Sequence, residues 1–338
     1  MTTNNTTHYP PVDADAIARA VDVLRRGGLV AMPTETVYGL AADARNDAAV
    51  RAIFAAKGRP ADHPVIVHVA DAARLDKWAR DVPRAARALA AAFWPGPLTL
   101  VLNRSSRVSD LITGGQHTVG LRAPAHPWAQ ALLRKFRGGL AAPSANRYGR
   151  ISPTRAEHVV ADLGAKPDGA VDLILDGGPC PVGIESTIVD LSGDTPRLLR
   201  PGAITREQLE AVLGEGVLVA DASDHNAPRA PGRQERHYAP RTPLELVHVS
   251  DIAGRLAALP PGSVALLAPA DSVPASAAVR LHIEAAPAPG PYARVLYENL
   301  RQLDASGAQW LLVAWPPAAI EWEALHDRLC RAAAGSAA

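Results

Sequence analysis

The chain has 338 residues, which is more than one average domain needs and suits two domains. Hydrophobic residues make up 48% and charged residues 20%, so the sequence can bury a sizeable core. The net charge of +1 excludes a general electrostatic attraction to nucleic acid or membrane, and any charged site must therefore be local.

The predicted elements of the first part of the chain mix helices and strands. Ile17, Val21 and Leu24 recur at helical spacing, in a segment that two glycines end. The predicted helices span 13–26, 47–57, 83–93 and 205–213, with Asp47 as the cap of the second. The predicted strands span 29–32, 65–69, 98–102, 118–122, 140–142, 173–176 and 186–191. Because the two types do not alternate strictly, we expect a mixed, twisted sheet rather than a doubly wound one.

The composition of the sequence changes after residue 213. Residues 220–243 are polar and rich in Pro, without apolar periodicity, which is typical of a linker or a functional loop. Beyond them, predicted strands at 244–249, 264–268 and 310–314 and predicted helices at 292–304 and 320–333 indicate a second, smaller α/β domain. We therefore expect domains at 10–213 and 244–338, joined by a linker at 214–243.

The cysteines and the N-terminus bear on the compartment. Cys180 and Cys330 lie far apart and lack metal-ligand spacing, which favours a reducing, intracellular compartment over a disulfide framework. The polar N-terminal segment lacks the basic region and apolar core of a signal peptide. No apolar run reaches the roughly 18 to 20 residues that a transmembrane helix needs. We expect a soluble, cytoplasmic protein.

Polar side chains gather in short motifs at the predicted strand and helix ends. Residues 33–39, PTETVYG, bring hydroxyls, a carboxylate and a phenol directly after a strand, as in an ordinary capped turn or a binding site. Lys57 and Arg59 either cap the C-terminus of a helix or face a polyphosphate. Composition alone favours the structural interpretation of both motifs.

Two further motifs stay open in the same way. Arg122 ends an apolar strand, and a buried guanidinium requires an anion, which is either a structural acid or a substrate carboxylate. Ser144 and Asn146 follow another strand, where they form an Asx-type turn or donate to phosphate or ribose. A glycine turn, a buried strand and a hydroxyl recur at 26–34 and 137–144, which predicts that two strand ends deliver hydroxyls to one sheet edge.

Familiar nucleotide-binding, metal-binding and hydrolase motifs are missing from the sequence. It contains no GxxxxGK[ST] loop, no GxGxxG after the first strand, no HExxH and no GxSxG. His63 and His68 have no third ligand at a suitable spacing, which argues against zinc. A bound nucleotide would therefore be held by scattered cations and hydroxyls.

Taken in order, nine motifs resemble those of the threonylcarbamoyl-AMP synthase family in its longer, two-domain form. The motifs are PTETVYGL, the KxR of Lys57 and Arg59, PVIVHV, FWPGPLTL, GLRAP, the SxN of Ser144 and Asn146, ESTIVD, LLRPG and PGRQERHYAP. Each is weak alone, but nine in register from about Gly27 to Ala333 are highly specific. The resemblance implies a YrdC-like twisted α/β sheet with flanking helices around a basic cavity, plus a smaller Rossmann-like α/β C-terminal domain.

The resemblance also implies an activity. L-threonine, bicarbonate and ATP would give threonylcarbamoyl-AMP and pyrophosphate, with Mg²⁺ bound mainly through the ATP phosphates. A downstream tRNA threonylcarbamoyl transferase complex would use the product to modify the adenosine next to the anticodon. Contact with tRNA itself is compatible with this role but not required, and no membrane contact is expected. Such chemistry needs positioning and charge neutralisation more than a nucleophilic residue.

The site residues follow from the resemblance motif by motif. The implied threonine subsite consists of Thr34, Thr36, His68, Arg122, the backbone at Ala142, and Ser186, with Arg122 clamping the threonine carboxylate through two parallel hydrogen bonds. The implied ATP contacts are Lys57, Arg59, His63, Thr118, Ser144, Asn146, Ser152, Arg200 and Tyr238. Lys57, Arg59, Ser144 and Asn146 are the implied catalytic residues. The linker would act as a lid, with His237 and Arg233 as further contacts.

Two other functions fit the same fold. Carbamoyltransferases of hydrogenase maturation, which make a carbamoyl adenylate, contain this module together with paired cysteines, whereas this chain has two distant ones. An RNA-binding or ribosome-assembly module would use a concave basic surface. The near-zero net charge and the lid-like linker favour the enzyme.

Overall fold

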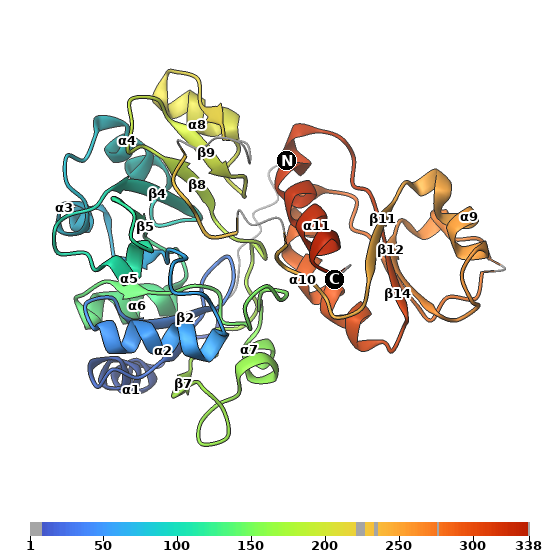
Figure 1. Ribbon diagram of the computed structural model, residues 1–338, viewed down its shortest axis with the longest axis horizontal. Helices are drawn as coiled ribbons and strands as arrows, with labels where there is room; N and C mark the ends of the chain where they lie inside the picture. Colours follow the sequence, from blue (N-terminus) through green and yellow to red (C-terminus); the bar gives the residue numbers. More distant parts are fainter. Residues whose placement is uncertain (1–8, 221–226, 233–235, 276, 337–338) are drawn as a thin grey trace.

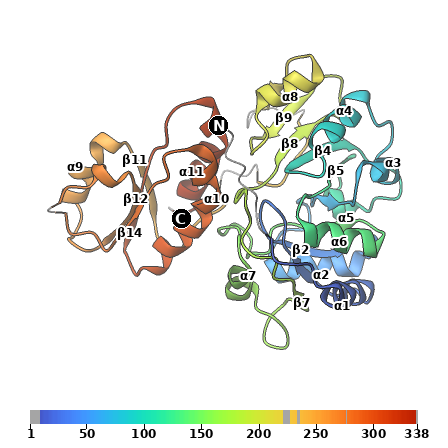
Figure 2. The same cartoon turned by 180° about the vertical axis from the view of Figure 1, so that it is seen from behind.

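The computed structural model describes residues 9–220, 227–232, 236–275 and 277–336. They form two units, built on two separate sheets, which lie side by side in Figures 1 and 2. Helices α10 (Pro289–Ala305) and α11 (Glu323–Ser336) lie between the two sheets, whereas α9 (Ile252–Ala257) lies on the far side of the second sheet. None of the described helices is both long and apolar enough to cross a membrane.

The first sheet is mixed, as predicted. Its described strands follow the order β10-β9-β8-β4-β5-β3-β6-β2-β1-β7, and β4 pairs antiparallel with β5 but parallel with β8. The strands are β1 (Val30–Met32), β2 (Gly39–Asp43), β3 (Val67–His68), β4 (Leu98–Asn103), β5 (Thr118–Arg122), β6 (Leu140–Ala141), β7 (Leu173–Ile174), β8 (Thr187–Asp190), β9 (Arg197–Arg200) and β10 (Leu218–Val219). The last of these lies inside the predicted linker, so the sheet extends further along the chain than expected.

Helices cover this sheet and follow the apolar patterns of the sequence. They are α1 (Ala14–Arg25), α2 (Asp47–Lys57), α3 (Leu75–Trp78), α4 (Arg84–Phe93), α5 (Asp110–Thr113), α6 (Pro127–Phe136), α7 (Ala156–Leu163) and α8 (Arg206–Leu213). The prediction that Asp47 caps α2 is wrong. Asn46 is the cap, because its backbone is extended and its side-chain oxygen accepts from Ala48 N and Ala49 N.

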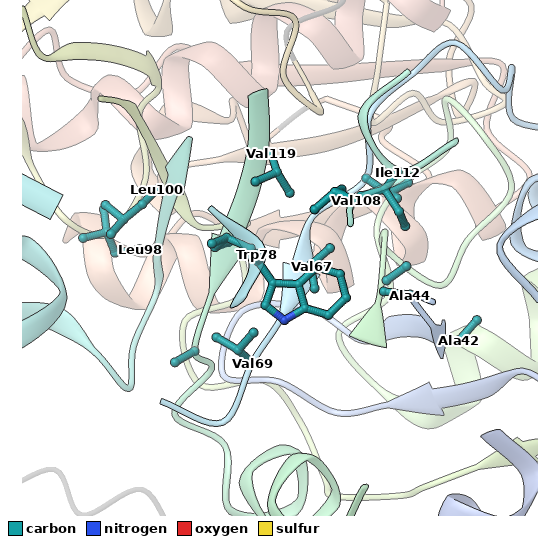
Figure 3. Close-up of a cluster of buried hydrophobic side chains, with 14 of the residues drawn as sticks. Ala42, Ala44, Val67, Val69, Trp78, Leu98, Leu100, Val108, Ile112 and Val119 are labelled. Carbon is teal, nitrogen blue, oxygen red and sulfur yellow. The ribbon is translucent and has the colours of Figure 1, made fainter. Parts of the chain in front are cut away.

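The core of the first unit shows why glycine is required at one strand start. Trp78 lies among the apolar side chains labelled in Figure 3, close to Val67. A Cβ on Gly139 would lie 2.3 Å from the Trp78 indole and 2.7 Å from the Val67 side chain. The second glycine of the sequence RGGL, directly before β6, therefore makes room for the indole ring.

The second sheet is parallel throughout, in the order β11-β14-β12-β13. Its strands are β11 (Leu244–Val247), β12 (Val264–Ala268), β13 (Leu281–Glu284) and β14 (Trp310–Ala314). Helix α10 begins three residues before the predicted start, with Pro289 in its first turn, where proline is favoured. A 3₁₀ turn at Ile320–Trp322 precedes α11.

The two units share a buried interface. One apolar cluster joins Val37, Ile151 and Ile184 of the first unit to residues of α10 and α11. Ion pairs flank it, with Arg301 Nη2 2.6 Å from Asp162 Oδ2 and Arg155 Nε 3.1 Å from Glu298 Oε2. The second unit therefore packs directly against the segments that carry the polar motifs.

Candidate active site

The polar motifs meet at a narrow cavity between the first sheet and the linker. The cavity volume is about 50 Å³, which holds a few water molecules but not a nucleotide. Most of the residues predicted for substrate binding line it. Those that do are Thr34, Thr36, Arg59, His68, Arg122, Ala142, Ser144, Ser186, Arg200, His237 and Tyr238.

One end of the cavity is built on Arg122, at the end of β5. Within the described residues, Nε donates to Gly96 O (3.3 Å), Nη1 to Thr36 Oγ1 (2.8 Å) and Nη2 to Glu35 Oε1 (2.6 Å). The open question about its anion is thus answered by Glu35, whose carboxylate is also buried. A guanidinium has five N–H donors, so one N–H on each η nitrogen still lacks a partner there. Two donors on neighbouring nitrogens can reach the two oxygens of one carboxylate.

The hydroxyls beside Arg122 serve both as turn caps and as cavity lining. Thr34 Oγ1 donates to Val37 O at 2.6 Å and accepts from Thr36 N and Val37 N at 3.2 Å. Its oxygen lies 2.9 Å from Thr36 Oγ1. The capped-turn interpretation of this motif therefore holds, and the same turn presents both threonines to the cavity.

His68, at the end of β3, lies in the same part of the cavity. Burial, followed by the charge of Arg122, lowers the pKa of His68 to about 3, so the ring is neutral at physiological pH. Its Nδ1 is buried and has no hydrogen-bond partner within the described part of the chain. The positive charge at this end of the cavity is therefore carried by the guanidinium.

The opposite end is organised by Arg200, at the end of β9. Its Nε donates to Ser186 O (3.0 Å), Nη2 to Ser186 Oγ (3.2 Å) and Nη1 to Pro231 O of the linker (2.9 Å). Gly232 approaches the same guanidinium so closely that a Cβ there would lie 2.9 Å from Arg200 Nη1 and 2.3 Å from the Tyr238 hydroxyl. The linker is thus fastened over the cavity by its backbone.

Arg59 and Tyr238 offer buried polar atoms to this end. Burial lowers the pKa of Arg59 to about 10, and its Nε has no partner among the residues described. The hydroxyl of Tyr238, whose ring is fully buried, also has no hydrogen-bond partner among the described residues. Unpartnered buried donors are costly, so their presence at one cavity indicates a polar ligand.

The remaining predicted ATP contacts do not line the cavity, and each has a protein partner. Lys57 Nζ donates to Ser144 O (2.5 Å) and Asn146 O (2.6 Å), which holds the loop that carries these two residues. Asn146 Nδ2 donates to Arg147 O and Arg150 O. Ser152 Oγ donates to Glu185 Oε1 (2.6 Å), and His63 Nδ1 lies 2.9 Å from Tyr148 Oη. Thr118 pairs with Asn103 through the backbone of the sheet.

These geometries give Lys57 a structural contact in the loop that carries Ser144. Burial and the charge of Arg59 lower its pKa well below the usual value, and its ammonium points at two carbonyls rather than into the cavity. Its direct contact with phosphate stays a prediction. Arg233 lies outside the described residues.

Two acids that sequence reasoning assigned no role belong to the site. Glu35 and Glu185 are both buried, and each is paired with an arginine. Both lie inside motifs already noted in the sequence, PTETVYGL and ESTIVD. In each motif a single glutamate stands among small, apolar and hydroxyl-bearing residues, and this pattern could have pointed to a buried carboxylate. Within the described residues no three His, Cys, Asp or Glu side chains are placed to hold a metal ion.

Comparisons with known proteins agree with this arrangement. The family model described as telomere recombination, which covers Sua5, YciO and YrdC, matches residues 22–202, and the model of the threonylcarbamoyl-AMP synthase C-terminal domain matches residues 204–334. Relatives named threonylcarbamoyl-AMP synthase include those of Bacillus subtilis, at 48% identity, and Pyrococcus abyssi, at 46% identity. Each alignment covers 68% of this chain and 66% of the relative, just under two thirds of its length.

Solved structures extend the likeness to both units. The crystal structure of P. abyssi Sua5 complexed with L-threonine has a TM-score of 0.87 at 36% identity, and the match covers 97% of this chain and 96% of that one. A variant of that protein with neighbouring His-to-Ala and Tyr-to-Ala substitutions has a TM-score of 0.84, also at 36% identity, over 95% and 93% of the two chains. Both domain models and the full-length structural match lead to one conclusion. The chain belongs to the threonylcarbamoyl-AMP synthase family, in its two-domain form.

Proposed function

We propose that this protein is an L-threonylcarbamoyladenylate synthase, which converts L-threonine, bicarbonate and ATP to threonylcarbamoyl-AMP and pyrophosphate. The observation that carries the proposal is the cavity itself. Among the described residues, a guanidinium with two N–H groups left for a ligand lies at one end of it, and buried arginines with further donors left lie at the other. One end suits an amino-acid carboxylate and the other suits phosphates.

At the amino-acid end, we assign the threonine carboxylate to the two open N–H groups of Arg122. Glu35 and Thr36 hold the guanidinium in a fixed orientation, so the fork is preorganised. Thr34 and Thr36 provide hydroxyls beside it, Ser186 provides one from the Arg200 side of the cavity, and the neutral ring of His68 adds no competing charge. The Ala142 backbone borders the same space. A related protein has been crystallised with L-threonine, which supports this assignment.

At the other end, we assign ATP to Arg59, Ser144, Arg200 and Tyr238. Threonine's amine and bicarbonate give a carbamate and water, and a carbamate oxygen then attacks the α-phosphorus while pyrophosphate leaves. The arginines would neutralise charge that develops on the phosphates, and the cavity walls would keep the two substrates in line. Lys57 and Asn146 act indirectly in this scheme, because they shape the Ser144 loop.

Mg²⁺ is part of the proposal as a partner of the ATP phosphates. Glu185, which lines the cavity, and Glu35, which lies behind Arg122, are both engaged by arginines, and the described part of the chain offers no carboxylate cage. Held by phosphates and water, the ion would supply charge neutralisation during the displacement. The proposed product would pass to a tRNA threonylcarbamoyl transferase complex in the cytoplasm.

The linker is proposed to act as a lid. His237 and Tyr238 line the cavity, and the space left beneath them is too small for ATP. Movement of the linker would make room for a nucleotide, and this supports the lid role.

The test is a pyrophosphate-release assay with ATP and Mg²⁺, in which threonine and bicarbonate are omitted in turn. We expect release only when both are present. Release that is indifferent to threonine would rule out the assignment, whereas release without added bicarbonate in carbon dioxide-free buffer would remove bicarbonate from the reaction.

A further inference from the structure

Arg328 reaches the wall of the cavity from the other domain. It lies on α11 of the C-terminal unit, yet it is only 1% exposed. Its Nε donates to Glu185 Oε2 (2.8 Å), and its Nη2 donates to Pro201 O (3.1 Å) and to Glu185 O (3.5 Å). Nη1 is held by the neighbouring carboxylate of Asp327 at 2.6 Å. One side chain of the second domain thus forms hydrogen bonds with two segments of the first, at Glu185 and at Pro201.

Glu185, its main partner, is part of the cavity lining. The carboxylate also accepts from Ser152 Oγ (2.6 Å) and from the Tyr297 hydroxyl of α10 (2.9 Å). Burial alone would raise the pKa of Glu185, but the charges of Arg328 and Arg200 and the hydrogen bonds from Ser152 and Arg328 lower it to about 2. The carboxylate is therefore ionised and fully engaged, and two of its donors come from the C-terminal domain.

The same guanidinium supports the linker. Its central carbon lies 5.3 Å from the centre of the Tyr238 ring, within the range of a cation–π contact. The Tyr238 ring also stacks on Tyr297, with centroids 5.6 Å apart. Arg328 donates hydrogen bonds to Glu185 and Pro201. These two residues are the direct chain neighbours of Ser186 and Arg200, which line the cavity.

We infer that Arg328 is a positioning residue of the active site, through which the C-terminal domain sets the Ser186, Arg200 and Tyr238 end of the cavity. The inference rests on the proposed synthase activity and gives the second domain a part in it. A buried ion pair that loses one partner leaves an uncompensated charge, which the protein relieves by moving or admitting water. Without Arg328, Glu185 would lose its main charged partner and Pro201 would lose a hydrogen bond. Movement of these two residues would displace their chain neighbours, Ser186 and Arg200.

The first test is steady-state kinetics of the full-length Arg328→Met variant, which keeps an unbranched stem but removes the guanidinium and its charge. We expect the KM for ATP to rise at least tenfold, because the affected end is the one assigned to phosphates. The KM for threonine should rise less than the KM for ATP, because Arg122 and Glu35 are not touched and Ser186 is the one residue of the threonine subsite next to Glu185. A merely structural role would lower the concentration of active enzyme, and hence the apparent kcat, with both KM values unchanged.

The second test asks for rescue. In the double variant Glu185→Gln with Arg328→Met, both charges of the buried pair are removed together, and Asp327 keeps its contact with Arg331. The amide introduced at position 185 can accept from Tyr297 through its oxygen and donate to Ser152 Oγ through its nitrogen. We expect its KM for ATP to lie closer to the wild-type value than that of Arg328→Met alone. If Arg328→Met does not fold, Arg328→Lys takes its place, with a smaller rise in the KM for ATP expected, because Lys keeps the charge but loses the fork.

Arg255→Met is the matched control. Arg255 also pairs with a glutamate, Glu245, and also lies over an aromatic ring, that of Trp310, but all three belong to the C-terminal domain. We expect wild-type KM values from it. A folded Arg328 variant with an unchanged KM for ATP would overturn the inference while leaving the synthase assignment intact. A wild-type protein without threonine-dependent pyrophosphate release would instead overturn the proposed function.

Discussion

At the scale of single residues, the site depends on charges that are buried and fixed. The sequence predicts that Arg122 needs an anion, because it ends an apolar strand. It does not predict that the anion is Glu35, because that pairing is set by the packing of β5 against the turn after β1. The consequence is a guanidinium that is held by the protein and still has two donors for a ligand.

Arg122→Lys should weaken the use of threonine while the protein stays folded. Lysine keeps a positive charge opposite Glu35 but cannot form a fork, so about 1.5–3 kcal/mol of charged hydrogen bonding to the carboxylate is lost. We expect kcat/KM for threonine to fall by about 10- to 150-fold, with the KM for ATP changed by less than about threefold. Equal losses for both substrates in steady-state kinetics would contradict the assigned role.

His68 should make the stability of the protein depend on pH. In the folded protein its pKa is about 3, whereas in the unfolded chain it has its usual value of 6.5. Between these values the unfolded state binds more protons, so this contribution to stability is complete above pH 6.5 and is lost as the pH falls. From pH 7 to pH 5 we expect the free energy of unfolding to drop by about 2 kcal/mol on account of this residue.

Urea unfolding at the two pH values provides the measurement. The drop should be smaller by that amount in His68→Gln, which carries no titrating group. An identical drop in the variant and the wild type would show that His68 is not the group responsible.

At the scale of elements, the sequence predicts the long and strongly patterned ones well. Helices α1, α2, α4 and α8 and strands β4, β5, β12 and β14 lie within one or two residues of their predicted bounds. Several elements are not predicted, including β9, β13, the short helices α3, α5 and α9, strand β2, and helices α6 and α7. Strand β2 follows a polar motif, and α6 and α7 begin after Pro-rich segments that are typical of loops. Short strands such as β3 and β6 are defined by their neighbours in the sheet rather than by their own sequence.

Gly183 lies in the loop before β8, at the point where α10 docks. A Cβ there would lie 2.4 Å from Ala293 O of that helix, and the residue has φ of +80°. Gly183→Ala should therefore push the helix away and lower the free energy of unfolding by about 2 kcal/mol or more. Gly193→Ala is the control, because a Cβ there meets nothing within 4 Å and its φ is not in the left-handed region. Equal stability of the two variants in urea would disprove the docking role.

The linker can be tested through the hydroxyl of Tyr238. Tyr238→Phe keeps the ring on Tyr297 and Arg328 and removes a buried hydroxyl that has no partner in the described part of the chain. We expect stability to stay the same or rise, while the KM for ATP rises about tenfold through loss of about 1.4 kcal/mol. Tyr292→Phe also removes such a hydroxyl, but from beside Trp322 in the C-terminal domain. Its kinetics should be those of the wild type, and an unchanged KM for ATP in Tyr238→Phe would exclude the contact.

At the scale of the whole molecule, two domains close one site. The sequence predicts the order of the motifs and the presence of a second α/β unit. It does not predict the contacts between Glu185 and Arg328, because these residues are 143 positions apart and only the packing of α11 brings them together. The same holds for Arg301 and Asp162, which are 139 positions apart. Most of the cavity lining was therefore predictable by resemblance, whereas its support from the second domain was not.

The central claim is that this cavity joins threonine, bicarbonate and ATP in one product. The most direct test is mass spectrometry of the nucleotides formed by the purified protein from ATP, Mg²⁺, L-threonine and ¹³C-bicarbonate. We predict an adenylate whose mass equals that of AMP plus a threonylcarbamoyl group, raised by one mass unit through the labelled carbon, together with pyrophosphate. Formation of only AMP or ADP, or of an adenylate without the label, would contradict the account.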